Sequence, residues 1–303
     1  MSASFTSALA AATEAAAGQH YPQGALYVVA TPIGNLADIS LRALHVLGLA
    51  DTIACEDTRH TQSLLRAYGI DKSSHQLLAL HQHNESEAAQ AVVGRMHQGQ
   101  RVAYVSDAGT PGVSDPGARL VAAVRALGLR AIPLPGASSV TSVLSVAGIG
   151  EDGGAGGFVF AGFLPNKSSE RALAVEALAQ QERAVVLLEA PHRIEALALA
   201  LAPLGTRPVT VGRELTKQFE EVATVSAEGL VAWLAEDANR LRGEFALVLH
   251  PAPVVADTGA DQRILQLLLA ELPLKTAVKL AAEITGAPRN DLYQRALALK
   301  VEA

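Results

Sequence analysis

A lone carboxylate in a glycine-rich loop is the feature of this sequence that points most directly to chemistry. Asp107 follows the apolar run Val102 to Val105, and the loop Ala108-Gly109-Thr110-Pro111-Gly112 comes after it. Asp115 is suited to cap the next helix, with Pro116 as its first residue. The order strand, loop, helix is that of an open α/β sheet, in which ligands bind beyond the carboxyl ends of strands. Asp107 therefore either caps a turn or binds a ligand.

Two other strand ends repeat this pattern in the same half of the chain. The apolar run Leu26 to Ala30 is followed by Thr31-Pro32-Ile33-Gly34-Asn35, and Ala131 to Leu134 is followed by Pro135-Gly136-Ala137-Ser138-Ser139. Glycine and proline end a strand and favour tight loops. The three loops together are expected to enclose one small ligand.

The loops indicate what kind of ligand this is. The sequence contains neither Gly-x-Gly-x-x-Gly nor Gly-x-x-x-x-Gly-Lys-Ser/Thr, and no Lys or Arg follows Asp107 before Arg119. A phosphate cradle needs converging N–H groups and usually a cation. A carboxylate, hydroxyls and backbone groups suit a ligand without phosphate that carries hydroxyls and positive charge. S-adenosylmethionine, with ribose hydroxyls, an amino acid tail and a sulfonium, has these properties.

Further candidates follow the neighbouring predicted strands. Glu56-Asp57-Thr58-Arg59 comes after the run Thr52 to Cys55. Its charges suit either a capped helix N-terminus or a site that orients a reacting hydroxyl. His81 and His83 follow the third strand, but two histidines in one loop fall short of the three or four ligands of a metal site. We therefore predict no metal at this pair.

Six motifs occur in an order that resembles the tetrapyrrole methylase superfamily, and in particular its RsmI branch. The match runs from about Leu26 to His250, although Thr31-Pro32 replaces the glycine-rich first loop of most members, as is typical of the RNA-modifying branch. The motifs are Thr31-Pro-Ile-Gly-Asn-Leu-Ala-Asp-Ile39, Glu56-Asp-Thr-Arg59, Ser106-Asp-Ala-Gly-Thr-Pro111, Pro133-Leu-Pro-Gly136, Gly162-Phe-Leu-Pro165 and Arg213-Glu-Leu-Thr-Lys217. The resemblance implies a homodimeric enzyme that uses S-adenosylmethionine and no metal. Its implied product is a 2′-O-methylated cytidine in the decoding centre of 16S rRNA of the small ribosomal subunit.

The resemblance also assigns donor-binding residues, and the chemistry of the charged side chains adds candidates for the reaction and for RNA contact. Donor binding carries over to Ile33, Gly34, Asp107, Ala108, Gly109, Thr110, Ser138, Ser139, Leu188 and Gly212. Candidates for the reaction itself are Glu56, Asp57, Arg59 and Glu214, with Glu189 and His81 as further possible bases. Candidates for RNA contact are Lys167, Arg193, Arg213, Lys275, Lys279, Arg289 and Arg295. The sequence does not choose among the bases.

Alternating elements must position these residues. Strands are predicted at 26–30, 52–55, 77–80, 102–105 and 131–134, and helices at 39–49, 58–67, 85–96 and 117–127. Such alternation predicts an α/β fold with a mainly parallel sheet. The expected domains are a disordered tail (1–23), an N-terminal methyltransferase lobe (24–147), a second α/β lobe (148–252) and a helical appendage (253–303). The glycine-rich segment 147–157 is the expected linker between the lobes.

The appendage resembles a helix-turn-helix. Helices are predicted at 264–272, 275–284 and 290–299, with basic residues on their exposed faces. Such faces belong either to a packing or dimerising tail or to an RNA-docking element. The rest of the chain offers no general basic surface, since the formal net charge of the 303 residues is −6.

The amino-acid composition indicates the class of protein and its cellular compartment. Half of the residues are hydrophobic, which suffices for a large core, and no apolar run approaches the ~20 residues of a membrane span. Cys55 is the only cysteine, which excludes a disulfide within the chain and fits a reducing, cytoplasmic compartment. In its apolar run, Cys55 is expected to be a small buried hydrophobe.

Two other functions compete with rRNA methylation. One keeps the methyl donor but changes the acceptor to a tetrapyrrole precursor or a modified protein residue. The helix-turn-helix-like appendage argues against it, since a small tetrapyrrole gives no reason for that element. The other is a non-catalytic RNA-binding protein with a donor-like pocket, and the intact loop around Asp107 argues against that.

Overall fold

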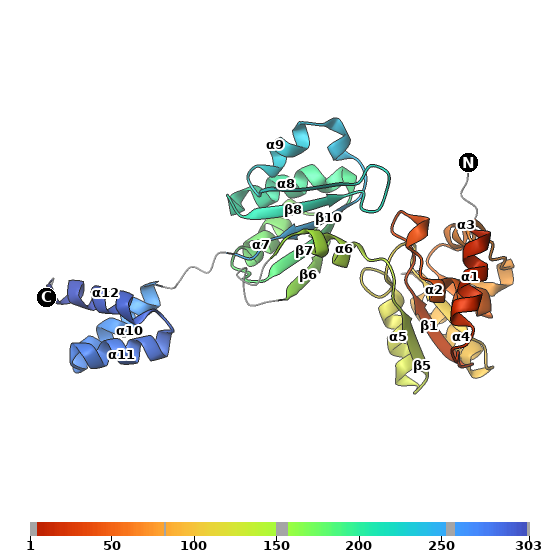
Figure 1. Ribbon diagram of the computed structural model, residues 1–303, viewed down its shortest axis with the longest axis horizontal. Helices are drawn as coiled ribbons and strands as arrows, with labels where there is room; N and C mark the ends of the chain where they lie inside the picture. The colour runs from red at the N-terminus through yellow and green to blue at the C-terminus, as the bar shows by residue number, and fades with distance from the viewer. Residues whose placement is uncertain (1–4, 82, 150–156, 253–257, 302–303) are drawn as a thin grey trace. The chain divides into compact units, whose positions relative to one another are not determined.

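The computed structural model describes residues 5–81, 83–149, 157–252 and 258–301. The chain forms two compact units, Met1–Pro251 and Ala252–Ala303 (Figure 1). Most of the predicted glycine-rich linker, residues 150–156, lies outside the described residues.

The first sheet has five parallel strands, which confirms the predicted parallel architecture. Its order is β3 (Leu77–Ala79), β2 (Thr52–Cys55), β4 (Val102–Val105), β1 (Ala25–Val29) and β5 (Arg130–Leu134). Each of these strands lies within one residue of its predicted bounds. Because all five run the same way, the loops after β1, β4 and β5 leave the sheet at one edge.

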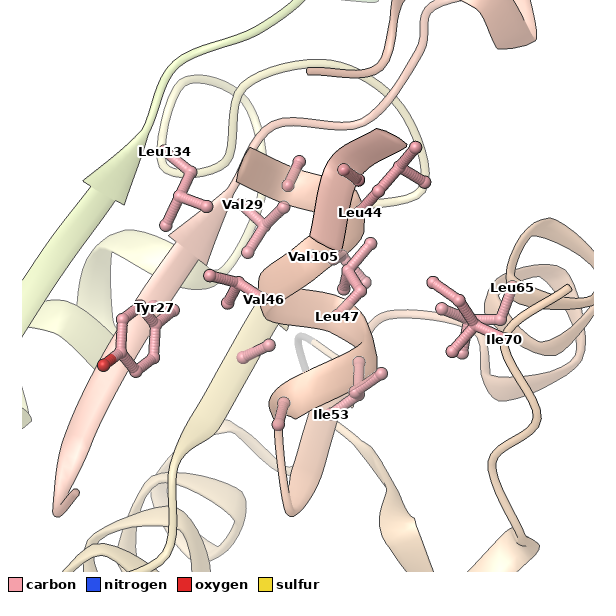
Figure 2. Close-up of a cluster of buried hydrophobic side chains, with 14 of the residues drawn as sticks. Tyr27, Val29, Leu44, Val46, Leu47, Ile53, Leu65, Ile70, Val105 and Leu134 are labelled. Carbon is pink, nitrogen blue, oxygen red and sulfur yellow. The ribbon is translucent and has the colours of Figure 1, made fainter. Parts of the chain in front are cut away.

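Helices cover this sheet and close its core. They are η1 (Leu36–Asp38), α2 (Leu41–Leu49), α3 (Thr58–Ala67), η2 (Ser74–Gln76), α4 (Glu85–His97) and α5 (Gly117–Ala126). The helix predicted from residue 39 begins at Leu41, because the Ser40 side chain accepts the Ala43 N–H as N-cap. In Figure 2, Tyr27 and Val29 of β1 lie near Leu44 and Val46 of α2 in this core.

The prediction of a disordered tail over residues 1–23 was wrong for most of that segment. Helix α1 (Thr6–Ala16) places Ala12 and Ala16 in the core of the first sheet, with 0% and 1% of their surface exposed. The Phe5 ring meets Tyr68 edge-on, at 5.3 Å between ring centroids. Alanine has the highest helix propensity, and alanines four residues apart share one face. The alanines of this segment therefore favoured a helix, but their small side chains did not mark a clear apolar face in the sequence.

This helix leads to a test of stability. Ala12→Asp is expected to lower the free energy of unfolding by about 3 kcal/mol, because it buries a charge without a partner. The matched control is Ala11→Asp, which changes an exposed neighbour on the same helix and is expected to cost less than about 1 kcal/mol. Urea denaturation followed by circular dichroism measures both. Equal losses in the two variants would contradict the packing of α1.

The second sheet is mixed. Its order is β6 (Phe158–Gly162), β7 (Ala184–Glu189), β10 (Phe245–Leu249), β8 (Pro208–Arg213) and β9 (Glu221–Ser226). Only β6 and β7 pair in parallel, and the other neighbours are antiparallel. The edge strand β9 was not predicted, because its alternating, half-exposed residues lack a continuous apolar run.

Helices around the second sheet are α6 (Ser139–Val146), α7 (Ser168–Ala179), η3 (Pro191–Arg193), α8 (Ile194–Leu201), η4 (Ala202–Leu204), α9 (Leu230–Ala235) and η5 (Ala238–Leu241). Helix α6 follows the last strand of the first sheet but packs on the second. Its Val140 and Val143 share a cluster with Val186 of β7 and Val248 of β10. The loop before α6 therefore connects the two sheets at the edge where the predicted ligand loops lie.

The second unit is helical, as predicted. It contains α10 (Thr258–Glu271), α11 (Leu274–Thr285) and α12 (Arg289–Val301), which pack around Leu265, Val278 and Leu292. Gly286 ends α11 in the left-handed conformation, with φ +73°. None of the helices in the described parts of the chain has the length and apolar character needed to cross a membrane.

Candidate functional site

A cavity of about 520 Å³ lies at the edge where the three loops of the first sheet emerge. Its other wall comes from the ends of β7, β8 and β10 and from Phe163, all within the unit Met1–Pro251. Nine of the ten predicted donor residues line it: Ile33, Asp107, Ala108, Gly109, Thr110, Ser138, Ser139, Leu188 and Gly212. The tenth, Gly34, lines a second hollow beside it, which Lys217 also borders.

Hydrogen bonds tie the three loops to one another without any ligand. Thr31 and Gly109 form an antiparallel bridge, with N···O distances of 3.0 and 3.1 Å. The Thr110 hydroxyl donates to the Ala137 carbonyl at 3.0 Å. Gly109 has φ +83°, a conformation that costs glycine nothing and strains other residues. The cavity is therefore largely pre-formed.

Asp107 connects two strand ends rather than capping its own turn. Its N–H donates to Glu56 Oε1 at 3.0 Å, and its Oδ1 accepts the Asp57 N–H at 3.2 Å. The side chain stays exposed among the residues that line the cavity. Its carboxylate is thus placed for a ligand by a network that spans β2 and β4.

Glu56 lines the cavity next to Asp107, and its environment favours the protonated carboxyl. Burial raises the pKa of Glu56, and the hydrogen bond from the Asp107 N–H only partly opposes this. The nearby charges of Asp107 and Asp115 raise that pKa further. A carboxylate whose pKa is raised is a stronger base than an ordinary glutamate. Among the predicted catalytic residues, Glu56 has the best position and electrostatics.

Asp57 and Arg59 have a structural explanation. Asp57 is the N-cap of α3 and accepts the Arg59 and His60 N–H groups at 2.7 and 3.3 Å. These bonds lower the pKa of its carboxyl, which is the opposite of what a general base needs. Neither residue is among those lining the cavity. The structure therefore favours a structural role at the N-terminus of α3 for Asp57 and Arg59, rather than a catalytic role.

Asp115 organises the second half of the loop. Its carboxylate accepts the N–H groups of Gly112 and Gly117, at 2.6 and 2.8 Å, and the hydroxyl of buried Tyr104 at 2.8 Å. Pro116 occupies the N-cap position predicted for Asp115, one residue later. Asp115 therefore lies one residue before the N-cap, and from there its carboxylate accepts the Gly117 N–H at the start of α5.

A strained turn after β8 presents Lys217 to the cavity. Glu214 and Thr216 have φ of 50° and 68°, a region that non-glycine residues rarely adopt. Lys217 Nζ lies 2.7 Å from Glu214 Oε1 and 3.0 Å from Glu244 Oε2. Strain of this kind persists where the surroundings fix it, often at functional sites. Gly34 packs against this lysine, since a Cβ there would lie 2.4 Å from Lys217 Cγ.

Glu214 was predicted as a catalytic residue, and the structure gives it another role. Burial raises its pKa, but the hydrogen bonds from Lys217 Nζ and the Glu244 N–H outweigh burial and lower it. It does not line the cavity, whereas Lys217 and Glu244 do. Glu214 therefore positions Lys217. Burial lowers the pKa of Lys217, but its two carboxylate partners outweigh this and raise it, so the ammonium stays charged.

Two of the predicted RNA contacts are engaged inside the fold. Arg213 is buried, and its guanidinium donates to the Arg242 and Phe219 carbonyls at 2.8 and 3.1 Å. Arg193 pairs with buried Glu189. These two predictions are corrected, because carbonyl oxygens accept hydrogen bonds from both guanidinium groups and the Glu189 carboxylate already pairs with the Arg193 charge.

The other predicted RNA contacts lie on the surface. Lys167 is exposed and pairs with Glu170. In the helical unit, Lys275, Lys279 and Arg289 are exposed and Arg295 is half-buried. Lys279 lies 3.9 Å from Glu283. Because these side chains lie on the surface, they are accessible to RNA, and RNA binding by them stays a prediction.

The sequence missed two features of the cavity wall, Lys217 and Phe163. Both lie within motifs that had already been singled out, but neither was assigned a role. Five carboxylates line the cavity, namely Glu56, Asp107, Asp115, Glu189 and Glu244, and among its described lining residues Lys217 is the only Lys or Arg. Such a lining favours a cationic ligand without phosphate. In the described chain, no three His, Cys, Asp or Glu residues are grouped to hold a metal ion.

Comparison with known proteins places the chain among methyltransferases. The profile of the tetrapyrrole (corrin/porphyrin) methylases matches residues 25–231, and that of the RsmI C-terminal HTH domain matches residues 255–300. Ribosomal RNA small subunit methyltransferase I of Escherichia coli O157:H7 is 46% identical over 280 residues, covering 91% of this chain and 95% of the relative.

Two solved structures share the fold. Uroporphyrin-III-C-methyltransferase from Thermus thermophilus superimposes with a TM-score of 0.53 at 21% identity, over 78% of this chain and 98% of the other. A structure of such an enzyme from the same organism, complexed with S-adenyl homocysteine, gives 0.50 at 17% identity, over 76% and 98%.

Proposed function

Because the chain belongs to the tetrapyrrole (corrin/porphyrin) methylase family, in its RsmI branch, we propose that it methylates 16S rRNA of the small ribosomal subunit with S-adenosylmethionine as donor. The acceptor in this proposal is the 2′-oxygen of a cytidine in the decoding centre. The name of the relative from Escherichia coli supports the rRNA substrate, and the match to the RsmI C-terminal domain supports the branch.

The acidic lining of the cavity is the observation that supports S-adenosylmethionine as the methyl donor. Its volume falls within the range of about 300–1,000 Å³ of small-molecule sites. Asp107, Thr110, Ser138 and Ser139 would hold the donor's cationic and hydroxyl groups. When bound there, S-adenosylmethionine supplies an electrophilic methyl group on a sulfonium.

Glu56 is the proposed general base. A ribose hydroxyl is a weak nucleophile, so the carboxylate of Glu56 takes its proton as the new C–O bond forms and the C–S bond breaks. General bases of this kind contribute about 10²–10⁴-fold. The remaining product is S-adenosylhomocysteine, which carries no sulfonium charge. The raised pKa of Glu56 supports the assignment.

Lys217 is the proposed electrostatic partner. Its ammonium, fixed between Glu214 and Glu244, stays protonated and places positive charge at the cavity wall. A fixed cation there stabilises the negative charge that develops on the 2′-oxygen without reorganisation during the reaction. Gly34 allows the first loop to approach the lysine stem.

The helical unit is the proposed RNA-docking element. Lys275, Lys279 and Arg289 would contact phosphate and position the substrate without reading its sequence. The chain is also proposed to act as a homodimer in the cytoplasm, as the resemblance implies. Sedimentation at micromolar concentration tests the dimer.

Methyl transfer to ribosomal subunits tests the function. Small subunits from cells lacking this enzyme are incubated with S-adenosylmethionine labelled in the methyl group, and the digested RNA is searched for labelled 2′-O-methylcytidine. Label in that nucleoside is the expected result. A parallel reaction offers uroporphyrinogen as the acceptor, and label in uroporphyrinogen alone would replace the proposal with a tetrapyrrole methylase. Donor binding without label in any acceptor would instead indicate a non-catalytic protein.

A further inference from the structure

Phe163 is a large apolar side chain held at the wall of the cavity with half of its surface, 50%, exposed. Only 4% of the residues in this chain are aromatic. A single exposed hydrophobic residue is common on protein surfaces and proves nothing by itself. At Phe163, however, the backbone on both sides is fixed so that the ring remains at the cavity.

The first device that fixes it is an irregularity in β6. The register between β6 and β7 shifts between Phe160 and Gly162, and Gly162 has φ +63°. A β-bulge re-aims the side chains that follow it and is common next to active sites. Phe163 is the residue directly after Gly162.

The second device anchors the loop just beyond the ring. Leu164 is buried in the core of the second sheet, and its carbonyl accepts a hydrogen bond from Arg193 Nη2. Arg193 Nε in turn lies 2.9 Å from Glu189 Oε1, and the Glu189 side chain is fully buried. Removing an ion pair from water is costly, so the pair stabilises the loop only as an intact unit. It fixes the backbone that presents Phe163.

Glu189 also brings an unused hydrogen-bond acceptor to the cavity wall. Its Oε1 accepts the Ala190 N–H at 3.0 Å, but its buried Oε2 has no hydrogen-bond partner. A buried carboxylate oxygen without a partner is unfavourable, and native structures usually satisfy such atoms. A ligand that donates a hydrogen bond there would remove this cost.

We propose that Phe163 and Glu189 form the subsite for the acceptor base, with Arg193 as a positioning residue; this inference rests on the proposed function. The target nucleotide leaves its stack, and its base stacks on the Phe163 ring. Glu189 Oε2 accepts a hydrogen bond from the exocyclic amine of the base. Carboxylates accept from the N4 amine of cytosine, and uracil has only a carbonyl at that position. The subsite therefore selects cytosine over uracil.

Single substitutions separate this subsite from the donor site. Phe163→Ala is expected to lower kcat/KM for small subunits by about 10–100-fold, because base–aromatic stacking is lost. Phe163→Trp is expected to restore most of the rate. The dissociation constant of S-adenosylhomocysteine, measured by calorimetry, should change less than about 3-fold in both, since the donor residues are untouched. The control is Phe158→Ala, which removes an exposed ring of β6 that does not line the cavity.

Glu189→Gln tests the readout of the base. Subunits are reconstituted with 16S transcripts that carry either cytidine or uridine at the position mapped for the wild type. Wild-type enzyme should prefer cytidine by at least about 10-fold, and the variant should lose most of this preference because its amide offers a donor as well as an acceptor. S-adenosylhomocysteine binding again serves as the check that the variant is folded.

Three outcomes would overturn the inference. If Phe163→Ala weakens S-adenosylhomocysteine binding as much as it lowers kcat/KM, the ring contacts the donor instead. If Phe163→Ala and Phe158→Ala have the same effect, the exposed ring has no special role. If Glu189→Gln keeps the full preference for cytidine, the carboxylate does not read the base. Failure of the proposed function differs from all three, because the wild type itself would then leave the RNA unlabelled.

Discussion

Replacing Asp107 with Asn is expected to weaken S-adenosylmethionine binding by about 10–100-fold, the loss of one charge-assisted interaction. Asn is isosteric, and its Oδ1 can still accept the Asp57 N–H, so the loop is expected to keep its conformation. Isothermal titration calorimetry with both S-adenosylmethionine and S-adenosylhomocysteine locates the contact. A larger loss for the sulfonium compound indicates an electrostatic role, and equal losses indicate hydrogen bonds to groups that the two share.

The control is Asp71→Asn, which removes the same charge from an exposed position away from the cavity. It separates a local effect of Asp107 from a change in net charge. Unchanged affinity of Asp107→Asn for both compounds would contradict the proposed donor site. Asp107→Ala should be worse than Asn, because it also removes the acceptor that joins the ends of β2 and β4.

Replacing Glu56 with Gln is expected to lower kcat by about 10²–10⁴-fold, the range typical of a general base. Gln keeps an oxygen for the Asp107 N–H, so donor binding should change little. The pH profile provides a second readout. The reaction needs the deprotonated carboxyl, and the pKa of Glu56 is raised, so kcat should increase with pH through a value above the usual range of a glutamate. This acid limb should disappear in the variant.

The neighbouring carboxylate provides the control for Glu56. Asp57→Asn keeps a good N-cap and lies outside the cavity, so it should leave both kcat and stability nearly unchanged. If Glu56→Gln retains the wild-type kcat and its acid limb, Glu56 is not the base. Buried Glu189 would then be the next candidate among the carboxylates that line the cavity.

The sequence alone determined the parallel sheet and the three loops that form one side of the proposed donor site. The reason is that the signals for these features are local. Continuous apolar runs mark strands buried on both faces, and glycine or proline directly after them ends each strand. Since parallel strands end at the same edge, the three loops of the first sheet were expected to meet around Asp107. The three helices of the second unit followed equally from local periodicity.

Only the tertiary structure decided which charged side chains are available for RNA contact or catalysis. Arg213 and Arg193 looked like free cations in the sequence, but the carbonyls of Arg242 and Leu164, each 29 residues away, accept hydrogen bonds from their guanidinium groups. The same holds for Glu214, whose pKa falls because the fold brings Lys217 and the Glu244 N–H to it. The ion-pair partners Glu189 and Lys217 lie only four and three residues away. Burial and the backbone contacts, however, depend on residues far apart in sequence, and no local pattern encodes them.

The fold likewise decided the two residues of the cavity wall that the sequence left without a role, Phe163 and Lys217. The ring is exposed because a bulge and a distant ion pair hold its loop, and the ammonium lies at the cavity because a strained turn places it there. The α1 helix was missed for a related reason. Its small alanines become a core face only where the first sheet gives them a surface to pack against.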